Sequence, residues 1–592
     1  MNAPSTRLAS RLNIPRRDFR RLSRTLGLLA TLGLALPGLA LADAKDGVDD
    51  SGTPRPAAET ASDLGNYLAG IVASSQRDYG SAADFMNRAL GGDPENIELL
   101  NDTFMLMAAE GRFDEAVVLA GRLVEVGSEN AIARLVLAVD AVGRGDDDGA
   151  LDALESLPDR GIATLTRPLL EAWVTLNRDG LEAAEAELLP LADQQGFTAL
   201  YQLHRALLND VAGQPEGAAE AYDAALGAVS ESSLRLTSLA GNFFERQGDI
   251  ERARALYDDF ALRNPDSLML EQEHARLASG GTAVMIFADY REGMAAALFD
   301  FASLLLQERI EEMAMVYSHL ALQLDPNLLL ARVLVGEMLQ EQERHTAAIE
   351  AYRQIPTTSP LAFSAQLRMA EELDALEQTD EAISLLRETA EAWPERFEPH
   401  YRIGNVLRAQ ERFSEAAAAY DLAMARLEEP GSRHWTLFYF RGISRERSQD
   451  WNRAEEDFLR ALELEPEQPY VMNYLAYSWV EQKRNLTEAE QMLKRAVELR
   501  PDDGYIVDSL GWVYYRLERY PEAVVELEKA VALRPSDPVI NDHLGDAYWR
   551  TGRGREAQVQ WRRALSLEPE EEDEKKILEK LEGGLKPDPE DI

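Results

Sequence analysis

Residues 538–569, PVINDHLGDAYWRTGRGREAQVQWRRALSLEP, decide the fold of this chain. With Pro538 counted as position 1, small residues occupy positions 8, 20 and 27 and large residues occupy positions 7, 11 and 24: Gly545, Ala557, Ala564, Leu544, Tyr548 and Trp561. Small residues let two helices approach closely, and large residues fill the space that remains between them. Pro569 at position 32 then ends the second helix. The stretch therefore predicts two antiparallel helices packed as a hairpin.

Residues 504–535 repeat this series one unit earlier. The equivalent residues are Leu510, Gly511, Tyr514, Ala523, Leu527, Ala530 and Pro535. The spacing resembles that of the tetratricopeptide repeat (TPR), a hairpin of two helices that recurs every 34 residues. The resemblance implies a solenoid in which each unit buries its apolar face against its neighbours.

The alanine at position 20 recurs through the chain. It is found at Ala82, Ala116, Ala150, Ala184, Ala218, Ala253, Ala314, Ala348, Ala382, Ala416, Ala454, Ala489, Ala523 and Ala557. The steps between these alanines are 34 or 35 residues, apart from one of 61 and one of 38. We therefore expect an all-α fold: an α-solenoid of about fourteen TPR or TPR-like hairpins in a right-handed superhelix, with a C-terminal capping helix. The units between residues 95 and 200 match the pattern poorly.

The irregular steps suggest how the chain is divided. We expect a signal peptide (1–44), a flexible linker (45–62), an N-terminal TPR-like solenoid (63–265), a joint with an extra helix and a loop (266–292), a C-terminal TPR solenoid (293–569) and a capping helix with a tail (570–592). These segments leave no stretch long enough for a separate catalytic domain. The sequence therefore predicts a protein that is not an enzyme.

The N-terminal segment resembles a bacterial export signal. Seven arginines precede an apolar run at residues 26–42, and small residues around Ala42 and Ala44 offer cleavage sites. Arg16 and Arg17 also resemble a twin-arginine motif, but Pro15 and Arg20 depart from it, so general secretion is favoured over twin-arginine export. A retained membrane anchor is a third option. We expect export to the periplasm.

Composition limits the partners and the chemistry. The formal net charge of -43 argues against nucleic acid, because few basic residues are free to displace phosphate counterions. The chain contains no cysteine, which excludes disulfides, a thiolate nucleophile and a lipoprotein anchor. We expect other proteins as partners, with no cofactor, metal or small-molecule substrate, and contact with a membrane only through an uncleaved leader.

Possible metal ligands do not form a persuasive pattern. Asp146, Asp148, Gly149 and Glu155 match part of an EF-hand loop, but its first ligand position falls on Arg144. The seven histidines show neither i, i+4 pairing nor a metalloprotease signature. Surface or structural roles are therefore favoured for all of these residues.

The candidate binding surface is the concave side of the C-terminal repeats. The first helix of each unit lines this side through positions near 2, 5, 9, 12 and 13. The residues at these positions that we predict to form a protein-binding groove are Tyr401, Asn405, Tyr439, Tyr470, Asn473, Tyr477, Tyr505, Asp508, Trp512, Tyr515, Arg516, Asp542, Trp549 and Arg550. Aromatic rings suit an apolar peptide, and the polar groups suit its backbone or termini. The alternative for each ring is packing between neighbouring units.

Residues 470–569, which contain NYLAYSWVEQKRNLTEAEQMLKRAVELRPDDG, resemble the C-terminal half of exported bacterial TPR proteins. The nearest type is the TPR adaptor of a carboxyl-terminal processing protease. The resemblance implies a non-enzymatic scaffold or adaptor in the cell envelope, with an envelope protease or its substrates as partners. A structural subunit of an outer-membrane assembly or polysaccharide export machine is the alternative. A cytoplasmic or membrane-tethered TPR protein with an uncleaved leader is a third option.

Overall fold

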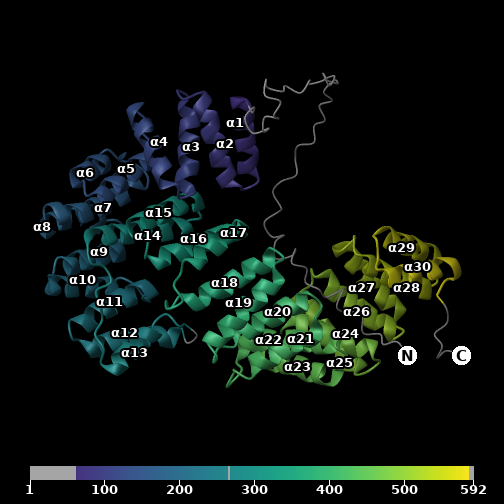
Figure 1. Cartoon of the computed structure of the whole chain (residues 1–592). Coiled ribbons are helices and arrows are strands. Elements are labelled where there is room, and N and C mark those ends of the chain that lie inside the picture. Colours follow the sequence, from purple (N-terminus) through teal and green to yellow (C-terminus); the bar gives the residue numbers. More distant parts are fainter. Residues whose placement is uncertain (1–61, 265–266, 586–592) are drawn as a thin grey trace, which may run out of the picture. The chain divides into compact units, whose positions relative to one another are not determined.

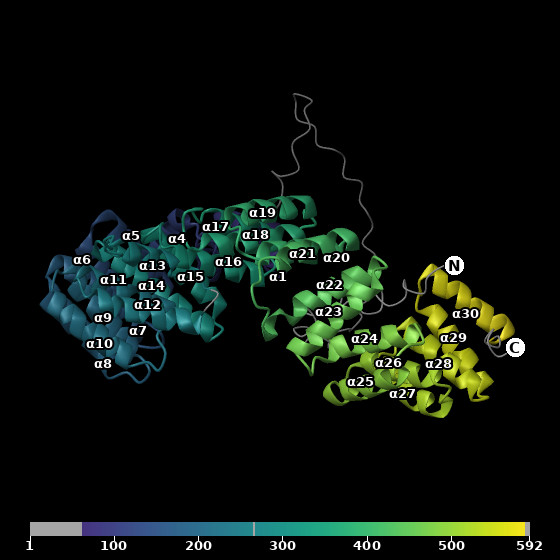
Figure 2. The same cartoon turned by 90° about the horizontal axis from the view of Figure 1, so that it is seen from below.

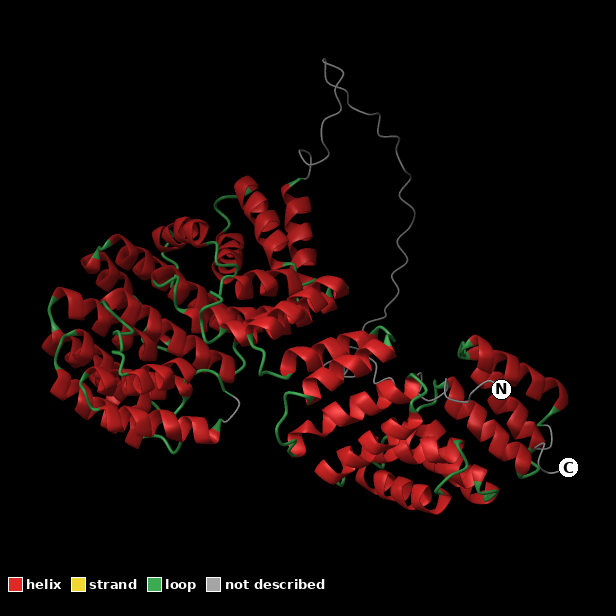
Figure 3. Ribbon diagram, turned by 60° about the horizontal axis from the view of Figure 1, so that its bottom comes forward, coloured by secondary structure: helices red, strands yellow, loops and turns green. Residues whose placement is uncertain are grey.

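A computed structural model describes residues 62–264 and 267–585. Within these ranges the chain forms thirty α-helices and one short 3₁₀ helix, without a β-strand (Figure 3). The all-α prediction is confirmed. The predicted signal peptide, nearly all of the predicted linker and the last residues of the predicted tail lie outside the described residues.

The chain divides into two compact units, described here as the N-terminal unit (62–385) and the C-terminal unit (386–585). The division falls inside α19 (Thr379–Ala392). Apart from α13, α18, α19 and α30, the described helices pair in sequence as thirteen hairpins, with the spacing that the alanines predict.

The N-terminal unit contains the first eighteen helices and the start of α19 (Figure 1). These helices are α1 (Asp63–Ser75), α2 (Tyr79–Gly92), α3 (Ile97–Ala109), α4 (Phe113–Glu125), α5 (Ala131–Arg144), α6 (Asp147–Glu155), α7 (Ala163–Arg178), α8 (Leu181–Ala192), α9 (Thr198–Val211), α10 (Pro215–Gly227), α11 (Leu234–Arg246), α12 (Ile250–Arg263), α13 (Glu271–Ser279), α14 (Tyr290–Gln307), α15 (Glu311–Leu324), α16 (Leu329–Glu341), α17 (His345–Arg353) and α18 (Ala362–Ala375).

The C-terminal unit continues the alternation of hairpin helices. Its helices are α20 (Glu398–Ala409), α21 (Phe413–Met424), α22 (Trp435–Arg447), α23 (Trp451–Leu464), α24 (Pro469–Glu481), α25 (Leu486–Leu499), α26 (Gly504–Arg516), α27 (Tyr520–Leu533), α28 (Pro538–Arg550), α29 (Gly554–Ser566) and the capping helix α30 (Glu571–Gly583). A 3₁₀ turn (Ser432–His434) fills the longer loop before α22. Asp503 and Asp537 cap α26 and α28 by accepting backbone N–H bonds at their N-termini.

The hairpins are held by the small residues that the sequence singles out. All fourteen position-20 alanines are buried, none more than 1% exposed. At position 8 the two helices come closer still. A Cβ added to Gly545 would lie 2.5 Å from the Trp561 ring, and one added to Gly511 would lie 2.6 Å from Leu527. Any side chain at these glycines would therefore push the helices apart.

Within the N-terminal unit, α14 and α15 pack against the inner side of the preceding helices. In Figure 1 they lie inside the arc that α3, α5, α7 and α9 form, and Figure 2 shows the same unit from below. The helix contacts agree, because α14 packs on α7 and α9 while α15 packs on α3 and α5. These four are the first helices of their hairpins, which line the concave side of a TPR array. We call this the self-covered face.

Close packing fixes α14 and α15 on the self-covered face. The Trp173 ring of α7 lies against Gly293 of α14, where a Cβ would overlap it. The Tyr290 hydroxyl donates a hydrogen bond of 3.0 Å to Asp147. Farther along, the His319 ring of α15 lies against Gly111 in the turn after α3. Residues 120 to 208 positions apart in the chain (293 − 173 and 319 − 111) are thereby joined.

A buried polar chain adds specificity to this docking. The indole N–H of Trp173 donates to Nδ1 of His204, at 3.1 Å. Because Nδ1 accepts, the proton of His204 is on Nε2, which lies 3.0 Å from Asp300 of α14. Arg235 also binds the Asp300 carboxylate, at 3.0 Å. The negative charge of Asp300 is therefore balanced by Arg235, and His204 remains neutral.

Acid should weaken the self-covered face. Burial lowers the pKa of His204, and burial with Arg344 and Arg332 nearby lowers the pKa of His319 to about 4. Since histidines in the unfolded chain take up protons near pH 6.5, the free energy of unfolding should fall as the pH drops from about 6.5 towards 4. Hydrogen exchange of helices α3 to α15 in the full chain, measured between pH 7 and 5, checks this.

The matched comparison replaces His319 by Gln, which cannot take up the proton. This variant should lose part of the pH dependence in α3 and α15, although its stability at pH 7 is lower. Protection of these helices that is unchanged or stronger at pH 5 would contradict the assignment.

Candidate protein-binding face

The fourteen predicted groove residues all lie on the first helices of the last five hairpins, namely α20, α22, α24, α26 and α28. They differ sharply in exposure. Tyr439 and Tyr477 are 3% exposed, Asp508 is 5% exposed and Asn473 is fully buried. The other ten are partly exposed. We use the name aromatic row for the partly exposed rings on the last three of these helices: Tyr470, Tyr505, Trp512, Tyr515 and Trp549.

Trp512 is the centre of the aromatic row. Its ring stacks on Tyr515 of the same helix, with centroids 4.7 Å apart, and on His543 of the next unit, 4.0 Å apart. Its indole N–H donates to Glu481 at 2.7 Å, and Arg516 binds the same carboxylate at 3.3 Å. Trp512 therefore links three successive units while keeping part of its ring in contact with solvent.

Tyr470 and Tyr505 occupy equivalent places in successive units. Arg500 lies over the ring of Tyr470, 5.6 Å from its centroid, and Arg534 lies over Tyr505 at 5.0 Å. Each arginine is at the end of the second helix of its hairpin. The repetition shows that this cation–π contact is part of the repeat itself.

The buried members of the predicted set pack between units. Tyr439 contacts Phe458 and Tyr474, with ring centroids 6.2 and 6.0 Å apart. The Asp508 carboxylate lies 2.9 Å from Nδ1 of His543. Neither polar atom of the Asn473 amide has a hydrogen-bond partner among the described residues, which costs about 1–3 kcal/mol. A ligand could reach this amide only if neighbouring side chains moved.

The capping helix covers the end of the predicted groove. Lys580 of α30 binds Asp542 at 2.7 Å and Asp546 at 2.8 Å. Although burial alone would lower it, the pKa of Lys580 is raised by these two carboxylates, and burial raises the pKa of Asp546 to about 6. Trp549 lies against Trp561 and against Gly584. Only part of the α28 face is therefore open to a partner.

The upstream end of the face is formed by polar contacts. The Tyr420 hydroxyl donates to Asn405 at 2.8 Å, and the Tyr401 hydroxyl lies 3.4 Å from that of Thr436.

At the other end of the face, Arg550 lies 3.4 Å from the Tyr515 hydroxyl. Burial, with Asp546 nearby, raises the pKa of Tyr515 to about 12, so this hydroxyl stays protonated at neutral pH.

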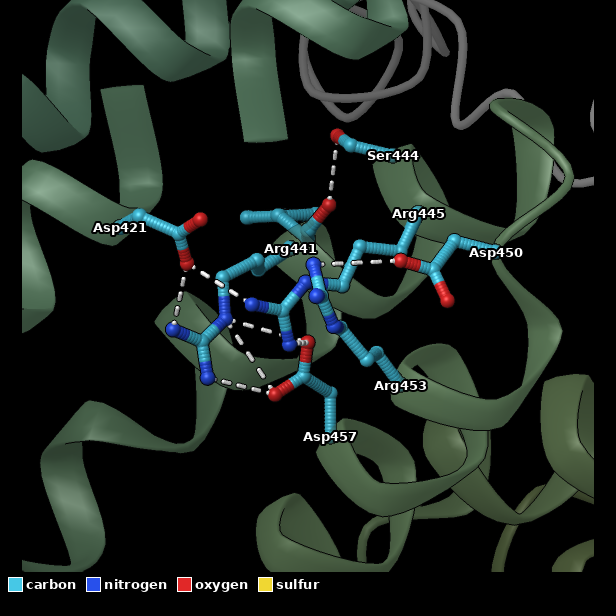
Figure 4. A network of polar contacts seen from close by, with 8 residues as sticks. Asp421, Arg441, Ser444, Arg445, Asp450, Arg453 and Asp457 are labelled. Carbon is cyan, nitrogen blue, oxygen red and sulfur yellow. Dashed lines mark hydrogen bonds and ion pairs between the residues drawn. The ribbon is translucent and has the colours of Figure 1, made fainter. Parts of the chain in front are cut away.

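An ion network lies among α21, α22 and α23 (Figure 4). Arg441 and Arg445 of α22 both bind Asp457, at 2.6 and 2.8 Å, and both reach Asp421, at 2.9 and 2.8 Å. The Asp457 side chain is only 3% exposed. Because two carboxylates balance two guanidinium groups, the network fastens one hairpin to the next and offers no spare charge to an anion.

The N-terminal unit contains a cleft of about 410 Å³ among α6, α7 and α8. Its polar lining includes Glu155, Glu171, Glu187, Arg167 and Arg178. Burial, together with the negative charge of Glu187, raises the pKa of Glu171 to about 7, although the positive charge of Arg167 lowers it in part. The cleft lies beside α6, which stops after nine residues at Glu155, close to Pro158.

The EF-hand-like residues have structural partners. Asp146 caps α6 by accepting from the Gly149 N–H at 3.1 Å, and Asp148 pairs with Arg178 at 3.1 Å. Across residues 62–264 and 267–585, no three acidic or histidine side chains form a group able to hold a metal ion. In the same ranges no helix has both the length and the apolarity needed to cross a bilayer.

The repeats match known family models over much of the C-terminal half. The tetratricopeptide repeat models match residues 239–267, 367–427 and 441–504, and a TPR repeat model matches residues 511–552. The chain contains tetratricopeptide repeats. The expectation drawn from residues 504–569 is confirmed to that extent, and no curated protein sequence matches the chain.

Three solved structures illustrate the similarity in fold. The Cut9–Hcn1 hetero-tetramer of the APC/C is 18% identical, covers 89% of this chain and 97% of that chain, and has a TM-score of 0.36. Yeast Tom70 is 14% identical, with 88% and 95% covered and a TM-score of 0.28. YrrB, described as a TPR protein with an unusual peptide-binding site, is 20% identical, with 33% and 97% covered and a TM-score of 0.27.

Sequence reasoning missed three features of these faces. The self-covered face, the Lys580 contact and the cleft beside α6 all depend on which residues meet across units. One signal was available: α14 is apolar around most of its surface, and eleven of its eighteen residues are buried. A hairpin helix that is covered on one side needs apolar residues on that side only. The apolar residues around most of α14 therefore indicate a helix that is covered on two sides.

Loss of Asp457 should destabilise the C-terminal unit. Asp457→Ala leaves Arg441 and Arg445 without their buried counter-charge, and breaking a buried pair in this way costs about 3–5 kcal/mol. Asp450→Ala is the matched control, since Asp450 is partly exposed and pairs only loosely with Arg453, at 3.4 Å. Its expected cost is below about 1 kcal/mol. Thermal unfolding followed by circular dichroism compares the two, and equal losses would contradict the role given to the network.

Proposed function

We propose that this chain is a non-catalytic scaffold that binds a segment of another protein on the concave face of its C-terminal unit. The repeats support the general part of the proposal, because stacked TPR hairpins present a long curved surface suited to peptides. The aromatic row carries the specific part. Large rings that keep contact with solvent at the middle of a face are typical of sites where a partner binds.

The state of the two concave faces favours the C-terminal unit. In the N-terminal unit α14 and α15 occupy the self-covered face, so a partner would first have to displace them. In the C-terminal unit, Trp512, Tyr515 and Arg516 remain partly exposed. An apolar side chain of a partner could pack on the Trp512 ring while Arg516 or Arg550 binds a carbonyl or a carboxylate beside it.

The partner segment would be extended or helical. The rings of the aromatic row are spread over three successive first helices, so one residue of a partner cannot contact them all. A linear segment that runs across α24, α26 and α28 can do so, and it can place alternate side chains on successive units. The strong negative charge of the chain favours a neutral or basic partner.

We place this activity in the bacterial cell envelope. The arginine-rich start, the apolar run and the small residues at 40–44 support export. The likeness of residues 470–569 to a protease adaptor supports an envelope protease or its substrates as partners. The alternative is a structural subunit of an outer-membrane assembly or export machine, which a stoichiometric complex with envelope components would favour.

Truncation of two rings of the aromatic row should weaken partner binding. Trp512→Ala and Trp549→Ala are each expected to weaken it by about 1–3 kcal/mol, because large aromatic rings are the interface residues that contribute that much. The measurement is affinity capture from an envelope extract with wild-type and variant protein as bait, followed by mass spectrometry and by titration with the captured protein.

The control separates binding from folding. Trp451→Ala removes a ring of the same size from the second helix of its hairpin, away from the aromatic row. Melting temperatures of all three variants set the assay temperature well below unfolding. If the Trp512 and Trp549 variants capture the partner as well as the Trp451 variant does, then these rings serve packing alone and the proposed face is wrong.

Cleavage of the leader should follow Ala42 or Ala44. Signal peptidases cut after small residues that follow an apolar run, and both sites have this pattern. Amino-terminal sequencing of the protein from a periplasmic fraction should therefore begin at Asp43 or Lys45. A protein that retains Met1 in the envelope would argue instead for an anchored leader.

A further inference from the structure

The first helix of the array carries an apolar stripe that the described chain leaves uncovered. On α1, Leu64 is 67% exposed, Leu68 is 54% exposed, and Ile71 and Val72 are 45% and 52% exposed. These residues are spaced by three or four and therefore lie on one side of the helix. Tyr67, 38% exposed, borders them. We call this set the α1 stripe.

The position of the stripe explains why it is uncovered. Each later hairpin in the N-terminal unit up to α12 packs its first helix on the second helix of the hairpin before it, as α3 packs on α2. No hairpin precedes α1 among the described residues, so the side that would meet one faces outward. Solenoids normally end in a unit with a polar outer face, because the terminal apolar surface is otherwise left in water.

The other end of the array is built differently. The exposed residues of α30 are mostly charged and include Glu571, Glu572, Glu574, Lys575 and Glu579. Ile577 is its one buried residue, and it faces the core of the C-terminal unit. The C-terminal end is therefore capped, and the stripe at the N-terminal end is not. An apolar surface at one end and a charged surface at the other do not complement one another.

Charge indicates what can cover the α1 stripe. The whole chain has a net charge of -43, so two copies repel each other over most of their surface. Residues 62–92, which form α1 and α2, contain three acidic residues and two basic residues, a net charge of -1 (3 acidic minus 2 basic). Only one of these charges, Asp63, is on α1. Two copies can therefore approach at this end without the repulsion that acts elsewhere.

We propose that a second copy of this chain covers the α1 stripe, so that two chains pair through their N-terminal ends. The pairing is two-fold, with the two α1 helices packed against each other. A head-to-tail arrangement would set the apolar stripe on the charged face of α30 and would extend into a filament. A two-fold pair matches stripe to stripe and is closed after two chains.

The size of the stripe sets the strength of the pair. A helix of thirteen residues is about 20 Å long, so two α1 helices with their flanking side chains form an interface at or below the roughly 1,200 Å² where stable complexes begin. The expected dissociation constant is in the micromolar range. Pairing should therefore depend on concentration.

Sedimentation velocity of the full chain tests the pairing. Wild-type protein should shift from monomer to dimer as its concentration rises through about 1–100 µM. Leu68→Glu places a charge at the middle of the stripe and should raise the dissociation constant at least tenfold. Leu262→Glu is the matched control, because Leu262 on α12 is 81% exposed and lies outside the stripe. It should leave the dimer unchanged, and circular dichroism verifies that both variants are folded.

A crosslink tests the two-fold geometry independently. The chain has no cysteine, so one introduced cysteine reports a single place. Residues near a two-fold axis meet their own copies, and Leu68 is close to the middle of α1. Leu68→Cys should therefore give a disulfide-linked dimer on mild oxidation, whereas Leu262→Cys should not. The proposal is overturned by a wild-type chain that stays monomeric up to about 100 µM, by a dimer that survives Leu68→Glu, or by equal crosslinking at both sites.

Discussion

The structure depends on one short-range constraint, the close approach of two helices at a residue with little or no side chain. Gly545 against Trp561 shows it most clearly, because a single added carbon would lie 2.5 Å from the ring. Gly442 against Phe458 and Gly404 against Tyr420 repeat the contact in earlier hairpins. Where the position holds alanine, as at Ala172 and Ala206, the residue is fully buried. The close approach places the large ring of the second helix against the small residue of the first. The next unit then stacks on the hairpin that these two helices form.

This constraint also explains how far the sequence was informative. A small residue needed at a fixed place in every hairpin appears in the sequence as a period, and the alanines from Ala82 to Ala557 made the number and the bounds of the hairpins predictable. The candidate face was predictable only in part. Helical spacing placed Trp512 and Tyr439 on equivalent faces, but it could not show that Trp512 keeps contact with solvent while Tyr439 is enclosed by Phe458 and Tyr474. That difference is decided by the residue that the following unit contributes.

The first helices of the hairpins are covered in the N-terminal unit and partly exposed in the C-terminal unit. In the N-terminal unit the inner side of the array is a core, built around Trp173, His204 and Asp300. In the C-terminal unit the equivalent helices carry partly exposed aromatic rings, and the ion pairs of Arg441 and Arg445 with Asp457 help to hold the hairpins together. The 34-residue period does not predict this difference, because it arises from contacts inside each hairpin. Whether these helices are buried or partly exposed depends on whether another part of the chain covers them.

The docking of α14 and α15 has a consequence for how the protein is made. Most repeat proteins can form structure as they leave the ribosome, because each new hairpin finds its support in the one just before it. Here the inner side of α3 to α9 must wait for residues 290–324, and the Tyr290 hydroxyl meets Asp147 only after 143 further residues have been added. Until then the chain exposes apolar surface that a folded neighbour cannot cover. Closing so long a loop is also slow compared with local hairpin formation. A nascent chain of this length would therefore remain a substrate for chaperones until α15 has emerged.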